Sequence, residues 1–215
     1  MEINELNRLL GNIDIYLLDQ ILKGRFTKEM KILDAGCGEG RNAVYFINQG
    51  YPIFGIDPNE VAIQYCRYQA KSLNPDFDIY RFQVGRLEDI PFHFGAFDAV
   101  ICSAVLHFAS GVDHFWQMMT EILRVLKPGG IFWFRMTTGF GGIWEESQDL
   151  GSGKYLLPDG SERFLLNQEI LEKLEQLGLR FLENPKSVLV HGQRAMGVFV
   201  MEKIQDSPGS FPSGK

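Results

Sequence analysis

The sequence Lys31-Ile-Leu-Asp-Ala-Gly-Cys-Gly-Glu-Gly-Arg-Asn42 joins a short apolar run to three glycines at every second position. The run predicts a buried strand over residues 31–34. Gly36, Gly38 and Gly40 predict a tight turn that a ligand can approach closely. Apolar residues at helical spacing follow the turn and predict a helix ending near residue 49. The stretch therefore indicates a nucleotide-type ligand at a helix N-terminus, and a tight turn without a ligand is the alternative.

Strand and helix patterns alternate along the rest of the chain. We expect further strands at residues 52–57, 78–84, 97–103, 131–135, 187–190 and 195–203, and helices at 14–22, 59–72, 112–126 and 168–177. This alternation predicts an α/β fold with a doubly wound, mostly parallel seven-stranded sheet and helices on both faces. The last two strands are separated only by residues 191–194. That break is too short for a parallel crossover, so we expect a C-terminal antiparallel hairpin.

The chain of 215 residues is 45% apolar, which is sufficient for one core. We expect a single domain over residues 1–205, with a helical N-terminal cap at 1–24, a lid-like insertion at 136–166 and a disordered tail at 206–215. The net charge of −6 and the pI of about 5.3 argue against nucleic-acid binding. No apolar run is long enough to span a bilayer, so we expect a cytoplasmic protein without membrane contact, as a monomer or homodimer. The three cysteines have no metal-ligand spacing and indicate free thiols.

The glycine spacing distinguishes between two kinds of nucleotide loop. A dinucleotide loop has the pattern Gly-x-Gly-x-x-Gly, in which the third glycine lets helix and strand pack closely. Counted from Gly36, the third glycine comes one place early, at Gly40, and Arg41 occupies the position where it is needed. The loop is therefore poorly suited to a pyrophosphate, and no lysine follows it in a P-loop pattern.

Five motifs in order resemble those of class I S-adenosylmethionine-dependent methyltransferases, which have a Rossmann-like fold. They are Asp34-Ala-Gly-Cys-Gly-Glu-Gly40, Gly55-Ile-Asp-Pro58, Leu87-Glu-Asp-Ile-Pro-Phe92, the segment 97–107, and Leu126-Lys-Pro-Gly-Gly130. The resemblance covers about residues 30–203. A weaker likeness, in Gly40-Arg-Asn42, Gly50-Tyr51, His191 and Arg194, is to the tellurite-resistance-like subgroup.

The resemblance implies S-adenosylmethionine as the cofactor and a set of residues that bind it. These residues are Gly36, Cys37, Gly38, Gly40, Asp57, Pro58, Leu87, Glu88 and Ser103. The glycine loop would abut the methionine part, Asp57 the ribose hydroxyls, and the backbone at Leu87 and Glu88 the adenine. Asp57 could instead cap the following helix. Many family members have a carboxylate where this chain has Arg86, which cannot accept a hydrogen bond from the adenine amino group.

Substrate contacts are expected beyond the carboxyl ends of the strands, where open α/β sheets bind ligands. The candidates are Tyr16, His107, Arg135, Trp144 and Arg194, with His107 or His191 as a general base if the acceptor arrives protonated. For His107, loop packing is an equal alternative. Arg135, Arg163 and Arg194 would suit an anionic substrate, and surface ion pairs explain them equally well.

These patterns favour an enzyme that moves a methyl group from S-adenosylmethionine to a small molecule by in-line displacement. The alternative is a non-catalytic S-adenosylmethionine-binding or regulatory module of the same fold. A methyltransferase that acts on a macromolecule is a third possibility, which no basic or elongated feature of the chain favours.

Overall fold

A computed structural model describes residues 2–204, and over these residues one mixed eight-stranded sheet forms the centre of the fold. Seven strands follow the order β10-β11-β5-β4-β1-β2-β3, and the short β9 pairs with β11 on the same edge as β10. The strands are β1 Ile32–Ala35, β2 Ile53–Asp57, β3 Phe82–Val84, β4 Phe97–Ser103, β5 Leu126–Thr138, β9 Leu179–Phe181, β10 Lys186–Val190 and β11 Arg194–Lys203. Strands β1 to β5 run parallel, whereas β11 is antiparallel to β5. The predicted sheet and hairpin are confirmed, and β9 is an addition to them.

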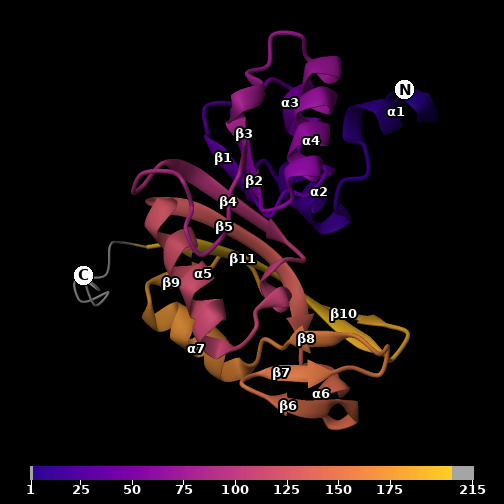
Figure 1. The fold of residues 1–215 in the computed structure, drawn as a ribbon, viewed down its shortest axis with the longest axis vertical. Helices are drawn as coiled ribbons and strands as arrows, with labels where there is room; N and C mark the ends of the chain where they lie inside the picture. The colour runs from indigo at the N-terminus through magenta and orange to yellow at the C-terminus, as the bar shows by residue number, and fades with distance from the viewer. Residues whose placement is uncertain (1, 205–215) are drawn as a thin grey trace.

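Helices cover both faces of this sheet (Figure 1). On one face lie α2 Ile15–Leu22, α3 Val44–Asn48 and α4 Glu60–Leu73, and on the other α5 Val112–Val125 and α7 Gln168–Gln176. Strand β5 shows how the sequence produces two cores: Phe132 and Phe134 point to the α5 side, and Trp133 points to the α2 side. Alternate side chains of a strand face opposite sides, so a strand buried on both sides reads as a continuous apolar run.

The helix starts and stops follow local capping chemistry. Asp14 caps α2 by accepting a hydrogen bond from the Tyr16 N–H at 3.0 Å, as predicted, and Asn59 caps α4. Two predicted strands had wrong bounds. The strand expected at 131–135 is longer, Leu126–Thr138, and the first part of the one expected at 78–84 is a 3-10 turn, Ile79–Arg81, which Asp78 caps. Residues 41–43 form turns, so α3 begins only at Val44. A further helix, α1 Ile3–Leu10, precedes α2 and buries none of its residues.

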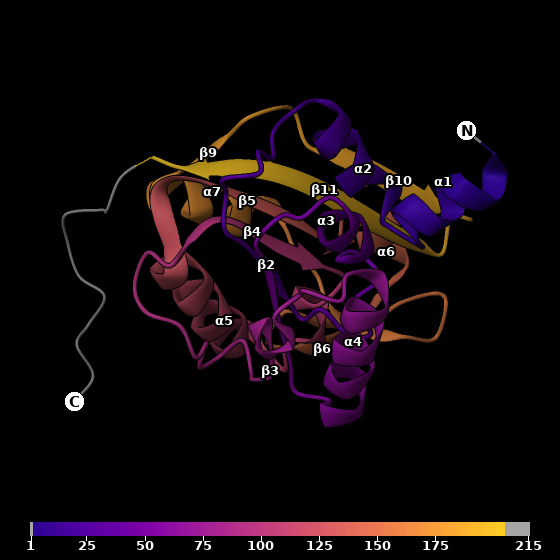
Figure 2. The same cartoon turned by 90° about the horizontal axis from the view of Figure 1, so that it is seen from above.

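Helix α2 is tied to the C-terminal hairpin by charged side chains. Asp19 pairs with Lys186 at 2.9 Å, and Glu183 pairs with both Lys186 and Lys23. The view from above shows α2 beside the β10–β11 end of the sheet (Figure 2). The N-terminal segment is thereby held across the same edge of the sheet as the late strands.

The insertion after β5 forms a small sheet of its own. It contains α6 Ile143–Glu146 and the antiparallel strands β6 Gln148–Gly151, β7 Lys154–Leu156 and β8 Glu162–Phe164, in the order β6-β7-β8. A separate apolar cluster, which includes Ile143, Tyr155 and Leu165, holds it together. The predicted insertion 136–166 overlaps β5 by three residues, because Met136–Thr138 still pair with β11. Its role as a lid stays a prediction.

The turn between β10 and β11 closes at the Val190–Arg194 pair, where Ala195 lies opposite Thr138 of β5. The turn therefore lies at the carboxyl end of β5, on the rim where ligands are expected. No helix of the described part is long and apolar enough to cross a membrane. The predicted tail 206–215 lies outside the described residues.

Phe134 lies at the centre of a stack of three rings, 4.6 Å from Phe132 and 4.7 Å from Phe199 between centroids, and it is fully buried. Replacing it by alanine leaves a cavity in the larger core. We expect Phe134→Ala to lower the free energy of unfolding by about 3–5 kcal/mol in denaturant titrations. The exposed Tyr68 of α4 gives the matched control, because Tyr68→Ala should change it by no more than about 0.5 kcal/mol. Equal effects of the two substitutions would contradict the proposed packing.

Candidate functional site

A cavity of about 780 Å³ opens at the carboxyl ends of β1, β2 and β4. Its volume lies within the range of roughly 300–1,000 Å³ that is usual for small-molecule sites. Six of the nine predicted cofactor residues line it. The lining residues are Asn12, Gly36, Cys37, Gly38, Glu39, Arg41, Asn42, Asp57, Pro58, Ser103, Ala104, Val105 and Phe108.

The three glycines of the loop differ in what surrounds them. Gly36 has a φ of +79° and lies close to the segment that follows β4. A Cβ at this position would come within 2.5 Å of the Val105 side chain. Gly38, with φ +53°, has open space where its Cβ would lie. Gly40 instead packs against the Cys66 thiol of α4, outside the cavity lining. The first two glycines shape the cavity, and the third seats the loop on α4.

Asp57 presents a carboxylate to the cavity at the end of β2. One of its oxygens accepts from the Gly38 N–H and the other from the Asn59 N–H, each at 2.9 Å. Because the Asn59 side chain caps α4, Asp57 is not needed as the helix cap. Each carboxylate oxygen has a further lone pair, so Asp57 can accept from two neighbouring hydroxyls.

Asp34 lies beneath the loop at the end of β1 and is 1% exposed. Neither of its carboxyl oxygens has a hydrogen-bond partner. Burial raises the pKa of Asp34 to about 7, and the nearby charge of Asp57 acts in the same direction. A carboxyl group in this position holds a proton up to near-neutral pH.

A buried carboxylate, Asp14, connects the N-terminal segment to two other sides of the cavity. It pairs with Arg135 of β5 at 2.8 Å and with Arg41 of the glycine loop at 3.5 Å. The Asp14 N–H donates to the Asn42 side chain, and Arg41 also donates to the Ser103 hydroxyl at 3.2 Å. Sequence analysis missed Asn12, Arg41 and Asn42 as lining residues, although the last two directly follow the glycines.

The segment after β4 forms the opposite wall. Ala104 has φ +61°, which is unusual for a residue with a side chain, and its N–H donates to the Arg135 carbonyl at 2.7 Å. This bend brings Ala104, Val105 and Phe108 into the cavity lining. Positive φ at a non-glycine residue carries no sequence signal, so these residues were not predicted.

The structure places Leu87 and Glu88 outside the cavity lining. The Leu87 side chain is buried in the core on the α5 side. The Glu88 carboxylate lies 2.6 Å from the His114 Nε2, within hydrogen-bonding distance, and forms an ion pair with Arg86 at 3.4 Å. The Glu88 carboxylate therefore contacts His114 of α5 and not the cavity. The backbone contact of Leu87 and Glu88 with an adenine stays a prediction.

Cys37 is a buried loop residue. A hydrogen bond with the Cys66 thiol and burial both raise the pKa of the Cys37 thiol above its ordinary value. At neutral pH the thiol is protonated and therefore a poor nucleophile. Its position agrees with a backbone role in the loop. All three cysteines of the chain are free and buried.

Three of the substrate candidates lie around the carboxyl end of β5. The Arg135 guanidinium lies over the Tyr16 ring at 5.4 Å from its centroid. His107 is 6% exposed, and its Nδ1 accepts from the Thr137 N–H at 3.3 Å. Burial, followed by the positive charges of nearby arginines, lowers the pKa of His107 to about 4. The ring is therefore neutral at pH 7 with its proton on Nε2, which makes it a donor and a poor general base.

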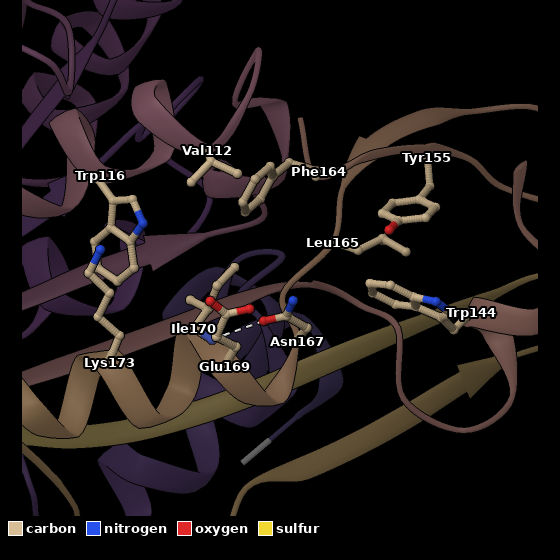
Figure 3. A pocket seen from close by; sticks show the side chains of 11 residues that line it. Val112, Trp116, Trp144, Tyr155, Phe164, Leu165, Asn167, Glu169, Ile170 and Lys173 are labelled. Carbon is tan, nitrogen blue, oxygen red and sulfur yellow. Dashed lines mark hydrogen bonds between the residues drawn. The ribbon is translucent and has the colours of Figure 1, made fainter. Parts of the chain in front are cut away.

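The remaining candidates lie elsewhere on the rim. Arg194, at the start of β11, pairs with Asp159 of the insertion at 3.2 Å, and His191 is exposed on the hairpin turn with φ +52°. Trp144 lines a second pocket of about 360 Å³ between the insertion, α5 and α7, where its ring lies near Tyr155 (Figure 3). Trp144 is thus not among the residues that line the larger cavity.

Comparison with known proteins agrees with this geometry. Residues 33–134 match the model of a methyltransferase domain family. A phthiotriol/phenolphthiotriol dimycocerosates methyltransferase of Mycobacterium tuberculosis is 32% identical over 104 residues, which are 47% of this chain and 36% of that protein. The chain thus matches about a third of that relative's length.

Solved structures share the fold over most of the chain. An S-adenosylmethionine-dependent methyltransferase of Methanosarcina mazei superposes with a TM-score of 0.67 at 20% identity and covers 86% of this chain and 97% of its own. A TehB-like methyltransferase of Corynebacterium glutamicum superposes with a TM-score of 0.58 at 22% identity. The superposition covers 88% of this chain and 89% of that protein. Residues 33–134 thus match a methyltransferase domain family, and the solved structures show that the chain has the fold found in S-adenosylmethionine-dependent methyltransferases.

The raised pKa of Asp34 predicts a pH dependence of stability. Between its ordinary value of 3.8 and about 7, the folded chain keeps a proton that the unfolded chain has lost. Stability from this group is therefore lost as the pH rises through that window, with a slope approaching about 1.4 kcal/mol per pH unit. We expect the free energy of unfolding of the wild type to fall relative to Asp34→Asn from pH 4.5 to 7 and the difference to level off above pH 7.5. Parallel curves in urea titrations would contradict the raised pKa.

Proposed function

We propose that this chain transfers the methyl group of S-adenosylmethionine to a small-molecule acceptor by in-line displacement. The observation that carries the proposal is the cavity itself, where a glycine loop and the Asp57 carboxylate face each other at the carboxyl ends of parallel strands. A second support is the enclosure of that cavity by the N-terminal segment through Asp14 and Asn12.

The residues of the cavity suit the parts of this cofactor. Asp57 has lone pairs for the two ribose hydroxyls, and the backbone at Gly36 and Gly38 is open to close approach by the methionine part. Arg41 and Ser103 lie together on the same wall and can hold a carboxylate. When bound, the cofactor supplies an electrophilic methyl group on a positively charged sulfur.

In the proposed transfer one bond forms as another breaks. A lone pair of the acceptor atom forms a bond to the methyl carbon while the carbon–sulfur bond breaks, and that bonding pair stays on sulfur, which becomes neutral. The chain contributes by holding the two reactants in line and excluding water, effects worth roughly 7–11 kcal/mol in well-oriented reactions. Phe108 lines the cavity, and Arg135 shares the Asp14 carboxylate with the lining residue Arg41, so we propose that the acceptor enters on this side.

The His107 geometry bears on the choice of acceptor atom. Its Nδ1 is already occupied by the Thr137 N–H, and its lowered pKa leaves little basicity at neutral pH. The exposed His191 faces solvent on the hairpin turn. The site therefore suits an acceptor that arrives with a free lone pair and does not need His107 to remove a proton.

A small acceptor fits the surface and the enclosure better than a macromolecule. The chain is acidic, with a net charge of −6, which disfavours nucleic acid. The insertion, residues 139–166, forms an ordered three-stranded unit beside the rim and would limit access to it. Its closure over a bound acceptor is part of this proposal.

Asp57→Ala should weaken S-adenosylmethionine binding by roughly ten- to hundredfold, because two charge-assisted hydrogen bonds to the ribose are lost. Calorimetric titration measures this change. Asp57→Asn keeps one acceptor oxygen and should fall between the wild type and Asp57→Ala. Asp76→Ala, at an exposed acid away from the cavity, should bind like the wild type. Unchanged affinity in a folded Asp57→Ala protein would overturn the assignment of the cavity.

Methyl transfer is tested with methyl-labelled S-adenosylmethionine and a metabolite extract, followed by mass spectrometry of the labelled product. The proposal predicts labelled small molecules that depend on the wild-type protein and are lost with Asp57→Ala. Tight cofactor binding without any labelled product across extracts would favour the non-catalytic binding module instead.

A further inference from the structure

Resting on the proposed methyl transfer, we infer that the acceptor carries an oxyanion, a carboxylate or a phosphate, which Arg135, Arg163 and Arg194 bind at the rim beside His107. The inference names the chemical class of the substrate. It depends on how arginines, their ion-pair partners and unpartnered donors are distributed around the carboxyl end of β5.

The three arginines reach this place from separate elements. Arg135 is on β5, Arg163 on β8 of the insertion and Arg194 at the start of β11. Each of them acts on the same buried ring, because the positive charges of all three contribute to the lowered pKa of His107. Residues far apart in the sequence thus direct positive charge to one point of the rim.

Two of these guanidinium groups lie over aromatic rings. Arg135 lies over Tyr16, and Arg163 lies over Phe108 with 4.9 Å from its guanidinium carbon to the ring centroid. Phe108 also lines the cofactor cavity. A cation–π contact limits the freedom of a guanidinium group before an anion binds, and each guanidinium group has five N–H donors, more than the contacts above use.

The local charges do not balance. Arg41 and Arg135 share the single carboxylate of Asp14. Arg194 pairs with Asp159, whose pKa is lowered in part by both Arg194 and Arg163. Within the described residues Arg163 has no ion-pair partner, and Arg41 and Arg135 share one carboxylate. The arginines at this rim therefore carry positive charge that no carboxylate of their own neutralises, which favours an anionic ligand over a neutral or cationic one.

Buried donors without partners gather at the same rim. The Nε atoms of Arg135 and Arg194 and the Thr138 hydroxyl are buried and make no hydrogen bond within the described part of the chain. Thr138 pairs in register with Ala195, next to Arg194. Unsatisfied buried polar groups are costly and rare, and an oxyanion at the rim supplies an acceptor of the kind that the two guanidinium Nε atoms lack.

The neutral His107 adds a donor and no acceptor. Because its Nδ1 accepts from the Thr137 N–H, its Nε2 carries the proton. The rim is therefore rich in donors, which suits a carboxylate or phosphate and disfavours an amine. An ionised oxygen also has a free lone pair, which agrees with a site where His107 is a poor base.

The test divides a metabolite extract by ion exchange at pH 7 into anionic, neutral and cationic fractions. Each fraction is incubated with the protein and methyl-labelled S-adenosylmethionine. We expect the acceptor in the anionic fraction. Treating that fraction with alkaline phosphatase separates the two sources of the oxyanion, because loss of the acceptor indicates a phosphate and its retention a carboxylate.

Two substitutions test the residues themselves. Arg163→Gln and Arg194→Gln should each lower the rate of labelling at limiting acceptor by roughly tenfold or more, since a charged hydrogen-bond donor to the anion is lost. Calorimetric affinity for S-adenosylmethionine should stay within about twofold of the wild type, because neither residue lines the cofactor cavity. Arg180→Gln is the matched control, at an exposed ion pair with Glu202 near the far end of β11.

The outcomes separate this inference from the function on which it rests. Labelling that comes from the neutral or cationic fraction would overturn the inference while supporting methyl transfer. Wild-type labelling by both Arg163→Gln and Arg194→Gln would also overturn it. Absence of labelling in every fraction, with the cofactor bound, would contradict methyl transfer and the inference together.

Discussion

The close approach of the Gly36 backbone to Val105 is the contact on which the site depends. A Cβ at Gly36 would lie 2.5 Å from the Val105 side chain, and the φ of +79° also requires glycine. This approach lets the loop after β1 turn across the ends of the neighbouring strands. The Gly38 N–H then reaches Asp57 at the end of β2. One steric constraint thus brings two strands and the segment after β4 to a single cavity.

Ion pairs of Asp14 connect the N-terminal segment and β5 to the glycine loop. Asp14 caps α2 and at the same time pairs with Arg41 of the loop and Arg135 of β5. The buried carboxylate is compensated by two guanidinium groups and the Tyr16 N–H, as a buried charge must be. The N-terminal segment therefore contacts the site, because Asp14 holds one arginine of the cavity, Arg41, and one of the rim, Arg135.

Periodicity and glycine positions were sufficient to predict the central strands, the helices that cover them and the hairpin, because buried parallel strands leave a strong apolar pattern. The glycine spacing predicted the loop of the cavity, and the family resemblance implied Asp57. The wall around Ala104 was missed, since a positive φ in a residue with a side chain has no sequence signature. The Asp14 network was missed because it joins residues 14, 41 and 135, whose proximity only the tertiary fold creates.

The most direct test of the account is a crystal structure of the chain with S-adenosylhomocysteine, the product that remains after methyl transfer. The account predicts the ligand in the cavity between the glycine loop and Val105, with both ribose hydroxyls on the Asp57 carboxylate and the sulfur directed toward the rim at Arg135. A ligand bound elsewhere, or one whose ribose makes no contact with Asp57, would contradict it.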